Sequence, residues 1–144
     1  MEIVVMNKHS AEEYSLERHE ESSVIISISS CKNTPAYIIP NKVANIKEVL
    51  FLEFNDTDST KFLDGGILSK DAKQICDFVN KYKDDVSLDK IIVHCEAGQS
   101  RSAGVAAAIM KYLNNDDTPI FNNHRYTPNM SCYRAVLNKF MENM

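Results

Sequence analysis

Residues 90–110 read KIIVHCEAGQSRSAGVAAAIM, and this stretch decides the fold of the chain. It opens with a short β-branched run, passes through a tight turn that contains Gly98, and ends in an alanine-rich segment that is apolar on nearly every side. The first part is typical of a buried strand and the last part of an enclosed helix. A strand that leads through a short turn into a helix is the building block of α/β proteins with a parallel sheet.

The rest of the chain repeats this alternation of strand and helix. Short β-branched or aromatic runs without strict alternation favour strands that are covered on both faces, and they lie at Ile3–Met6, Val24–Ile28, Val49–Phe54 and Lys90–His94. Helical patterns lie between or after these runs: one opens at Ser10 with a capping box, one follows Ser69, one covers about 101–113, and one follows Pro128–Asn129. We therefore expect a three-layer α/β fold, in which a mainly parallel central sheet of about four to five strands is flanked by helices.

The segments between these elements are expected to be loops, at 31–47, 55–68 and 114–127. No repeat, low-complexity tract or Pro/Gly/Ser-rich linker divides the chain, so residues 1–144 are expected to form a single domain. Loops that follow the carboxyl ends of parallel strands are where functional residues gather, so the site is expected there.

Charge and composition exclude several kinds of partner. The net charge is −4 and no block of Lys and Arg is present, which argues against nucleic acid as the main partner. The longest apolar stretch, around Val105–Met110, is too short to span a bilayer, so no membrane partner is expected. The first residues lack the pattern of a signal peptide, and the four cysteines form no CxxC pair, so we expect a reduced, cytoplasmic protein without a metal site.

Cys95 and Arg101 frame the turn between the buried strand and the enclosed helix. A short turn into a helix N-terminus can direct successive backbone N–H groups inward, and such a nest on the positive end of a helix dipole binds an anion. Gly98 permits a backbone angle that other residues resist. The donors that hold an anion also favour the thiolate of Cys95, and Arg101 offers a planar fork that matches two phosphoryl oxygens. The combination indicates covalent phosphoryl transfer.

The string His94-Cys95-x-x-Gly98-x-Ser100-Arg101-Ser102 resembles the signature loop of the cysteine-based protein phosphatases, in their dual-specificity-like branch. The match includes the five-residue gap between the Cys and the Arg and the hydroxyl residue that follows the Arg. The surrounding sequence is similar to small tyrosine phosphatases predicted in bacteria and phages. The resemblance is strong over about residues 48–113, weaker over Tyr126–Tyr133 and weakest before residue 45.

The resemblance implies a role for each position of the loop. Cys95 is similar to the nucleophile of the family, which forms a phosphocysteine intermediate, and Ser102 to the hydroxyl that stabilises the departing thiolate. His94 matches a residue that supports the thiolate through the hydrogen bonds of the loop without touching the substrate. The phosphate cradle of the family, where a phosphate or sulfate ion is expected to bind, corresponds to Glu96, Ala97, Gly98, Gln99, Ser100 and Arg101. No cofactor is implied.

The family also uses an Asp on a nearby loop to protonate the leaving group. The segment after the third strand contains three candidates, Asp56, Asp58 and Asp64. Asp56 is preferred because it comes just past the end of the strand, as the acid of the family does. All three could instead be ordinary turn residues, since Asp is common in loops.

The sequence therefore predicts an enzyme that hydrolyses phosphate monoesters, with phosphotyrosine in proteins as the first expected substrate and phosphoserine or phosphothreonine as others. A nucleotide or an RNA 5′ end is an alternative substrate. A phospho-binding pseudophosphatase and a sulfur-transfer or arsenate-reducing enzyme are alternative functions. Arsenate reduction needs a second cysteine near the first, whereas Cys31, Cys76 and Cys132 are expected to be packing residues.

Overall fold

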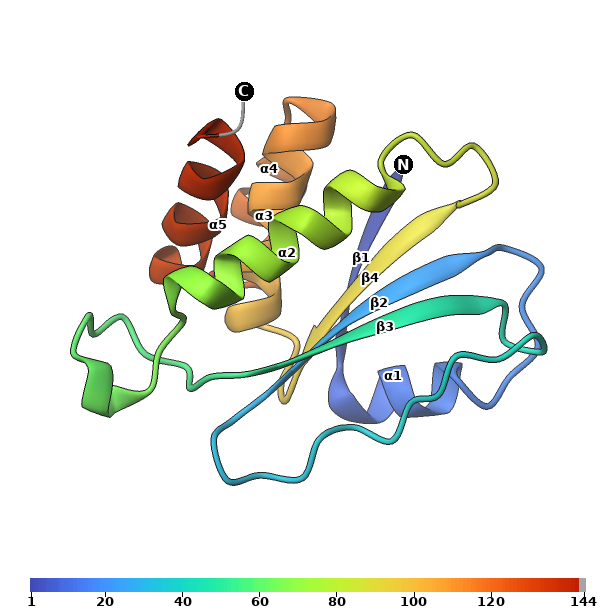
Figure 1. Ribbon diagram of the computed structural model, residues 1–144, viewed down its shortest axis with the longest axis horizontal. Helices are drawn as coiled ribbons and strands as arrows, with labels where there is room; N and C mark the ends of the chain where they lie inside the picture. The colour runs from blue at the N-terminus through green and yellow to red at the C-terminus, as the bar shows by residue number, and fades with distance from the viewer. Residues whose placement is uncertain (143–144) are drawn as a thin grey trace.

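The computed structural model describes residues 1–142 and contains a central four-stranded sheet with helices on both faces (Figure 1). The strands are β1 (Glu2–Asn7), β2 (Ser23–Ser29), β3 (Ile46–Glu53) and β4 (Lys90–Cys95). They lie in the order β1-β4-β2-β3, and each neighbouring pair is parallel. The predicted α/β class with a parallel central sheet is therefore confirmed.

Each face of the sheet carries its own apolar core, which makes the molecule three layers thick. Helix α1 (Lys8–Tyr14) lies on one face together with the buried side chains of Ala36, Ile38 and Ala44 (Figure 1). The opposite face is covered by α2 (Ser69–Tyr82), α3 (Arg101–Asn114) and α5 (Met130–Glu142), which enclose the larger core. Strands β2 and β4 are the interior strands of the sheet, and both of their faces are buried.

Helix α3 is the most enclosed helix, as its alanine-rich sequence predicts. Its side chains from Ala103 to Ile109 are fully buried. Gly104 has no side chain where the helix meets the start of α5, and a Cβ atom there would lie 2.4 Å from the backbone oxygen of Asn129. No helix within residues 1–142 has the length and apolar character needed to cross a membrane.

Two helix starts differ from the sequence expectation. Helix α1 begins at Lys8, because the Asn7 side chain at the end of β1 accepts the Ser10 N–H at 2.7 Å and caps the helix three residues before the expected cap, Ser10. Ser69 is the first residue of α2 and not its cap. There the Asp71 carboxylate accepts the backbone N–H of Leu68 at 2.8 Å.

Two of the expected loops contain additional structure. Segment 114–127 includes the short helix α4 (Thr118–Phe121), which starts with a proline in its first turn, a position that proline tolerates well. Segment 55–68 includes a single 3₁₀ turn, Phe62–Asp64, which ends at Gly65 in the left-handed conformation. Strand β3 also begins earlier than expected, at Ile46.

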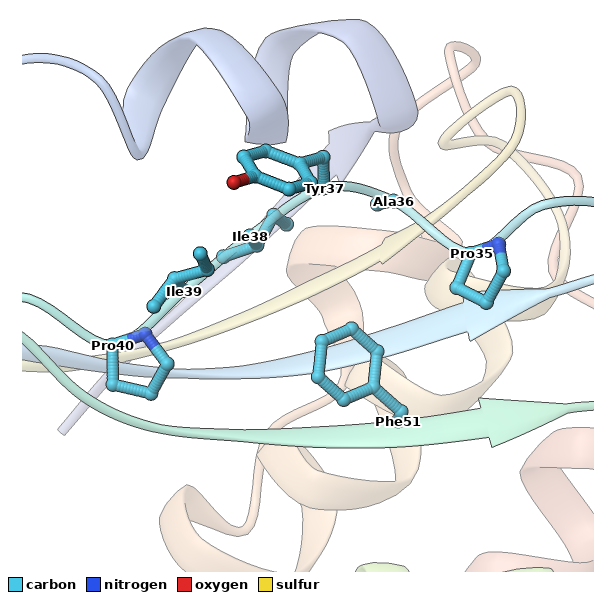
Figure 2. A pocket seen from close by; sticks show the side chains of 7 residues that line it. All are labelled: Pro35, Ala36, Tyr37, Ile38, Ile39, Pro40 and Phe51. Atoms are coloured by element: carbon cyan, nitrogen blue, oxygen red, sulfur yellow. The ribbon is translucent and has the colours of Figure 1, made fainter.

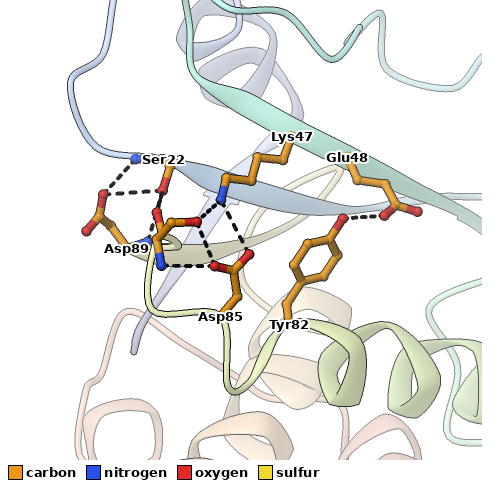
Figure 3. A network of polar contacts seen from close by, with 7 residues as sticks. Ser22, Lys47, Glu48, Tyr82, Asp85 and Asp89 are labelled. Atoms are coloured by element: carbon orange, nitrogen blue, oxygen red, sulfur yellow. Dashed lines mark hydrogen bonds and ion pairs between the residues drawn. The ribbon is translucent and has the colours of Figure 1, made fainter.

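A polar network joins the elements at the amino-terminal end of the sheet (Figure 3). Lys47 of β3 contacts Asp85 at 3.4 Å, and the backbone N–H of Ser22 donates to Asp89 at 2.8 Å. Beside it, Glu48 accepts from Tyr82 of α2 and from Lys81, and these hydrogen bonds lower the pKa of the Glu48 carboxyl. This network lies at the end of the sheet opposite the segment 95–101.

Candidate active site

Cys95 is the last residue of β4, an interior strand between β1 and β2. Residues 96–100 form the turn that follows, and Arg101 begins α3. Gly98 has a φ of 66°, and a Cβ atom at this position would lie 2.7 Å from the backbone of Met6 and Asn7. Glycine is needed both for the positive φ and for this close approach to β1.

The loop of residues 95–101, which we call the phosphate loop for the role that the sequence predicts, is held from outside by its carbonyl groups. The carbonyl oxygens of Glu96, Gln99 and Ser100 accept backbone hydrogen bonds from Lys8 (3.2 Å), Thr127 (2.9 Å) and Asn129 (3.0 Å). Within residues 1–142, none of the backbone N–H groups of residues 96–100 donates to another group. The loop therefore directs its carbonyls to the protein and keeps its N–H donors available, which is the arrangement of an anion-binding nest.

Cys95 is at the floor of this loop and is only 2 % exposed. Its sulfur lies 3.0 Å from the hydroxyl oxygen of Ser102, and the backbone N–H of Ser102 lies 3.5 Å from the same sulfur. Both groups can donate to a thiolate, so the first turn of α3 directly supports negative charge on Cys95.

His94 lies on the opposite side of the sheet from Cys95 and does not face the loop opening. Its Nε2 is 2.6 Å from the Ser27 hydroxyl, and its Nδ1 is 3.4 Å from the Cys95 carbonyl oxygen. Burial lowers the pKa of the imidazole, so the neutral form is favoured. With Nδ1 donating to the carbonyl and Nε2 accepting from the hydroxyl, a neutral ring satisfies both contacts.

Arg101 is 5 % exposed, and its guanidinium is anchored along one edge. Its Nη1 donates to the Phe54 carbonyl at 2.7 Å and to the Ser30 hydroxyl at 3.0 Å, so residues just beyond the ends of β3 and β2 hold it in place. The buried Nε has no hydrogen-bond partner among the described residues. An unpaired buried donor is costly, and an oxyanion in the phosphate loop would satisfy it.

The structure separates the three acid candidates. The Asp56 carboxylate accepts the Ser100 hydroxyl at 2.7 Å and therefore touches the phosphate loop. Asp58 contacts α5 only through its backbone carbonyl, which accepts from Ser131 at 3.2 Å. Asp64 belongs to the 3₁₀ turn, where its backbone bonds to Lys61 and Asn55. Within residues 1–142, Asp56 is the one candidate whose carboxylate is bonded to the phosphate loop.

A polar hollow of about 250 Å³ adjoins the loop at this point, and its lining consists of Asp56, Thr57, Asp58, Ser100, Thr127, Pro128 and Asn129. A larger hollow of about 490 Å³ lies beside β3 and is lined almost entirely by apolar groups of Phe51 and segment 35–40 (Figure 2). It contains none of the candidate site residues. The smaller hollow, in contrast, is lined by Asp56 and Ser100, two of the residues that the sequence predicts for the site.

Three contributors to the site were not found from the sequence: Ser30, Phe54 and Asn129. Ser30 and Phe54 anchor Arg101 from positions that are 71 and 47 residues away. Asn129 precedes a helical pattern, which marks it as a cap, but nothing local indicates its contact with Asp56, which is 73 positions away.

Two of the remaining cysteines, Cys76 and Cys132, are buried, as the expected packing role requires. All four cysteines of the chain are free thiols. Burial raises the pKa of Cys76 to about 12, and burial also raises that of Cys132. A thiol that resists ionisation is a poor nucleophile at neutral pH, so neither side chain resembles a reactive cysteine.

The architecture defined by these elements is that of the dual-specificity phosphatases. Human DUSP28 superimposes with a TM-score of 0.63 at 15% identity, covering 98% of this chain and 92% of its own. The human tyrosine phosphatase-like serine/threonine/tyrosine-interacting protein gives 0.59 at 17% identity, covering 98% and 89%, and PTPMT1 gives 0.56 at 18%, covering 98% and 90%. At these identities the likeness establishes the fold and confirms the resemblance to dual-specificity-like phosphatases.

A match to a family model assigns the chain more specifically than the fold does. The model of the Rit1 DUSP-like domain matches residues 59–142, which is more than half of the chain, and the protein belongs to this family. The matched range includes the phosphate loop and Asn129 but begins after Asp56 and Asp58. No curated protein matches the sequence. The comparisons do not bear on the bacterial or phage part of the resemblance, which stays a prediction.

Proposed function

We propose that this protein hydrolyses phosphate monoesters through a phosphocysteine intermediate on Cys95. The observation that carries the proposal is the environment of the Cys95 sulfur, which lies 3.0 Å from the Ser102 hydroxyl. Around it are a turn with unpaired N–H donors and the buried Nε of Arg101, which has no partner among residues 1–142. A nucleophile and a set of oxyanion donors are thus directed at the same place.

The reaction has two steps. In the first, the Cys95 thiolate attacks phosphorus, the bond between phosphorus and the leaving oxygen breaks, and Asp56 gives its proton to that oxygen. In the second, water attacks the phosphocysteine, Asp56 takes a proton from the water, and orthophosphate leaves. Ser102 donates to the sulfur as it departs as a thiolate. Arg101 holds two phosphoryl oxygens throughout.

Phosphotyrosine in proteins is the first substrate we propose, with phosphoserine and phosphothreonine as further members of the class. A nucleotide or an RNA 5′ end is the non-protein alternative. One structural neighbour, PTPMT1, was solved with PI(5)P, and a mouse neighbour with zinc tungstate. These ligands suggest tungstate as an oxyanion probe and a phosphoinositide as one member of a substrate panel.

Turnover of an aryl phosphate by the wild-type protein and by Cys95→Ser tests the proposal. The variant is expected to lose turnover while still binding tungstate in a calorimetric titration, because the N–H donors and Arg101 remain. Cys31→Ser is the matched control, because it makes the same chemical change at a cysteine that is half-buried. This variant is expected to keep the turnover of the wild-type protein.

Two outcomes would contradict the proposal. Substantial turnover by Cys95→Ser would exclude the covalent mechanism. Tungstate binding without any wild-type turnover on the substrate panel would instead support a phospho-binding pseudophosphatase. Retention of activity when Cys31, Cys76 and Cys132 are all replaced by Ser would exclude the arsenate-reducing alternative, which needs a second cysteine.

A further inference from the structure

Asn129 lies between the three segments that form the site and is only 4 % exposed. Its backbone N–H donates to the Ser100 carbonyl at 3.0 Å, which ties it to the phosphate loop. Its Oδ1 accepts the backbone N–H of Cys132 at 3.0 Å at the start of α5. Its Nδ2 donates to the Asp56 carboxylate at 2.8 Å and to the Thr57 carbonyl at 3.2 Å. One residue therefore joins α5, the phosphate loop and the segment of residues 56–58, which we call the acid segment.

The two donors that reach Asp56 approach the same oxygen. Asn129 Nδ2 and the Ser100 hydroxyl both donate to Asp56 Oδ1, at 2.8 and 2.7 Å. An oxygen that accepts two hydrogen bonds in this way does not carry the proton of the neutral acid. The proton of a neutral Asp56 is therefore confined to Oδ2, the oxygen that neither donor occupies.

We propose that Asn129 is a positioning residue for the general acid: together with Ser100 it holds Oδ1 of Asp56 and so assigns the transferable proton to Oδ2. The inference rests on the proposed function, in which Asp56 protonates the leaving oxygen. The proton passes from Oδ2 to the ester oxygen as the bond to phosphorus breaks, and in the second step Oδ2 takes a proton from the attacking water. Asn129 itself touches neither substrate nor phosphoryl group.

Asn129 also caps α5, so the test must separate the cap from the contact with Asp56. Asn129→Ser does this, because serine is a good N-cap but is too short to donate to the Asp56 carboxylate. Ser131→Ala is the matched control. It removes another hydrogen bond between the start of α5 and the acid segment, to the Asp58 carbonyl, without touching Asp56.

The measurement compares kcat/KM for two substrates, phosphotyrosine as the poor leaving group and an aryl phosphate of a low-pKa phenol as the good one. A general acid contributes about 10²–10⁴-fold and most for a poor leaving group. Asn129→Ser is expected to lower kcat/KM for phosphotyrosine by about tenfold, which is a part of the contribution of the general acid. It is expected to change kcat/KM for the activated ester little. Ser131→Ala is expected to leave kcat/KM unchanged for both substrates.

The pH profile gives a second readout that a purely structural role would not move. Removing a hydrogen bond that favours a carboxylate makes the group hold its proton to higher pH. The alkaline fall in rate is therefore expected to move to higher pH in Asn129→Ser. In an Asp56→Asn background, Asn129→Ser is expected to produce no further leaving-group-dependent loss, because the acid that it positions is absent.

Equal losses on both substrates in Asn129→Ser, with an unmoved pH profile, would overturn the inference and leave the proposed function intact. If the wild-type protein had no turnover, or if Cys95→Ser did not reduce that turnover, the proposed function would be overturned, and the role of Asn129 with it. The two failures are therefore distinguished by the wild-type and Cys95→Ser measurements in the same experiment.

Discussion

The Arg101 side chain divides its donors between the protein and the expected ligand. Nη1 is bound to the ends of two strands, whereas Nε is buried without a partner among residues 1–142. The anchored edge fixes the plane of the guanidinium, and the other edge is the one that can meet two phosphoryl oxygens. Lysine cannot reproduce this division, because its single ammonium has no fixed plane.

Arg101→Lys is expected to lower kcat on an aryl phosphate by about 10²–10³-fold, the cost of losing one preorganised donor to a developing charge. Turnover and tungstate affinity are measured on the same preparation, and circular dichroism checks that the variant is folded. A loss below fivefold would show that Arg101 does not hold the phosphoryl group.

Asp56→Asn is expected to slow phosphotyrosine hydrolysis by about 10²–10⁴-fold and an activated aryl phosphate far less, because only the poor leaving group needs the proton. The alkaline fall of the pH–rate profile should also disappear, since it reports the loss of that proton. The check is a set of pH–rate profiles on both substrates.

Asp58→Asn and Asp64→Asn are the controls for this prediction, because both residues belong to the same segment but neither carboxylate is bonded to the phosphate loop. If Asp58→Asn alone gave the leaving-group-dependent loss, the acid would lie two residues further along. If none of the three did, the acid would lie outside residues 55–68.

The residues that sequence could identify are those that are close together along the chain. Cys95, Arg101 and Ser102 occupy one short motif, and the α3 N-terminus brings them together locally. The contacts that complete the site join positions from 44 to 73 residues apart, between Asp56 and its two donors Ser100 and Asn129. Such contacts depend on how the sheet and helices pack, which no local pattern reports.

At the scale of elements, the contact between α3 and the start of α5 determines the position of Asn129. Gly104 permits this contact, since a Cβ atom there would lie 2.4 Å from the Asn129 backbone oxygen. Glycine is normally the poorer helix residue by about 1 kcal/mol, so alanine at a free position would stabilise α3. The contact is thus kept at the expense of helix propensity.

Gly104→Ala is expected to destabilise the protein in spite of that propensity. Overpacking costs about 1–3 kcal/mol, which exceeds the gain of about 1 kcal/mol from alanine, and a backbone oxygen cannot rotate away from the new methyl group. Urea unfolding measures the change in the free energy of unfolding. An unchanged or increased stability would mean that the two helices separate without cost.

Strand positions were predictable because continuous apolar runs suit strands buried on both faces, and this holds for β2 and β4. Helix starts were less predictable. Asn7 belongs to β1 and caps α1 from within the strand, so a search for a cap in front of the helical pattern passed over it. The short helix α4 is too brief to show a period.

At the scale of the whole molecule, the buried His94 makes stability depend on pH. Burial lowers its pKa in the folded state, whereas an unfolded chain binds the proton near pH 6.5. The unfolded state therefore binds more protons as the pH falls below about 6.5, and the free energy of unfolding decreases there. Above that pH the group is neutral in both states and contributes no pH dependence.

His94→Gln tests this effect, since glutamine does not titrate and its amide can reach Ser27 in place of Nε2. The stability advantage of the wild-type protein over the variant is expected to narrow as the pH falls from 7.5 to 5. Urea unfolding of both proteins at each pH measures it, and the other titrating groups cancel in the difference. A gap that stays constant over this range would show that His94 does not carry the pH dependence.

The order β1-β4-β2-β3 also belongs to this scale. The sequence predicted parallel strands but not their order, because neighbouring strands in the sheet are distant in the chain. With that order, the ends of β2, β3 and β4 lie at one edge of the sheet, and Ser30, Phe54 and Cys95 meet around the same site. The site therefore exists only when the whole sheet is assembled.

The three carbonyl groups that fasten the phosphate loop connect it to Lys8 near one end of the chain and to Thr127 and Asn129 near the other. Since the loop forms only in the folded molecule, an oxyanion that it binds is thermodynamically linked to folding of the chain as a whole. Such a ligand adds RT ln(1 + [L]/Kd) to the unfolding free energy, about 2.7 kcal/mol at a hundred times Kd. Heat resistance of the protein is thus a gauge of ligand affinity that requires no turnover, and it can rank candidate phosphates before the natural substrate is known.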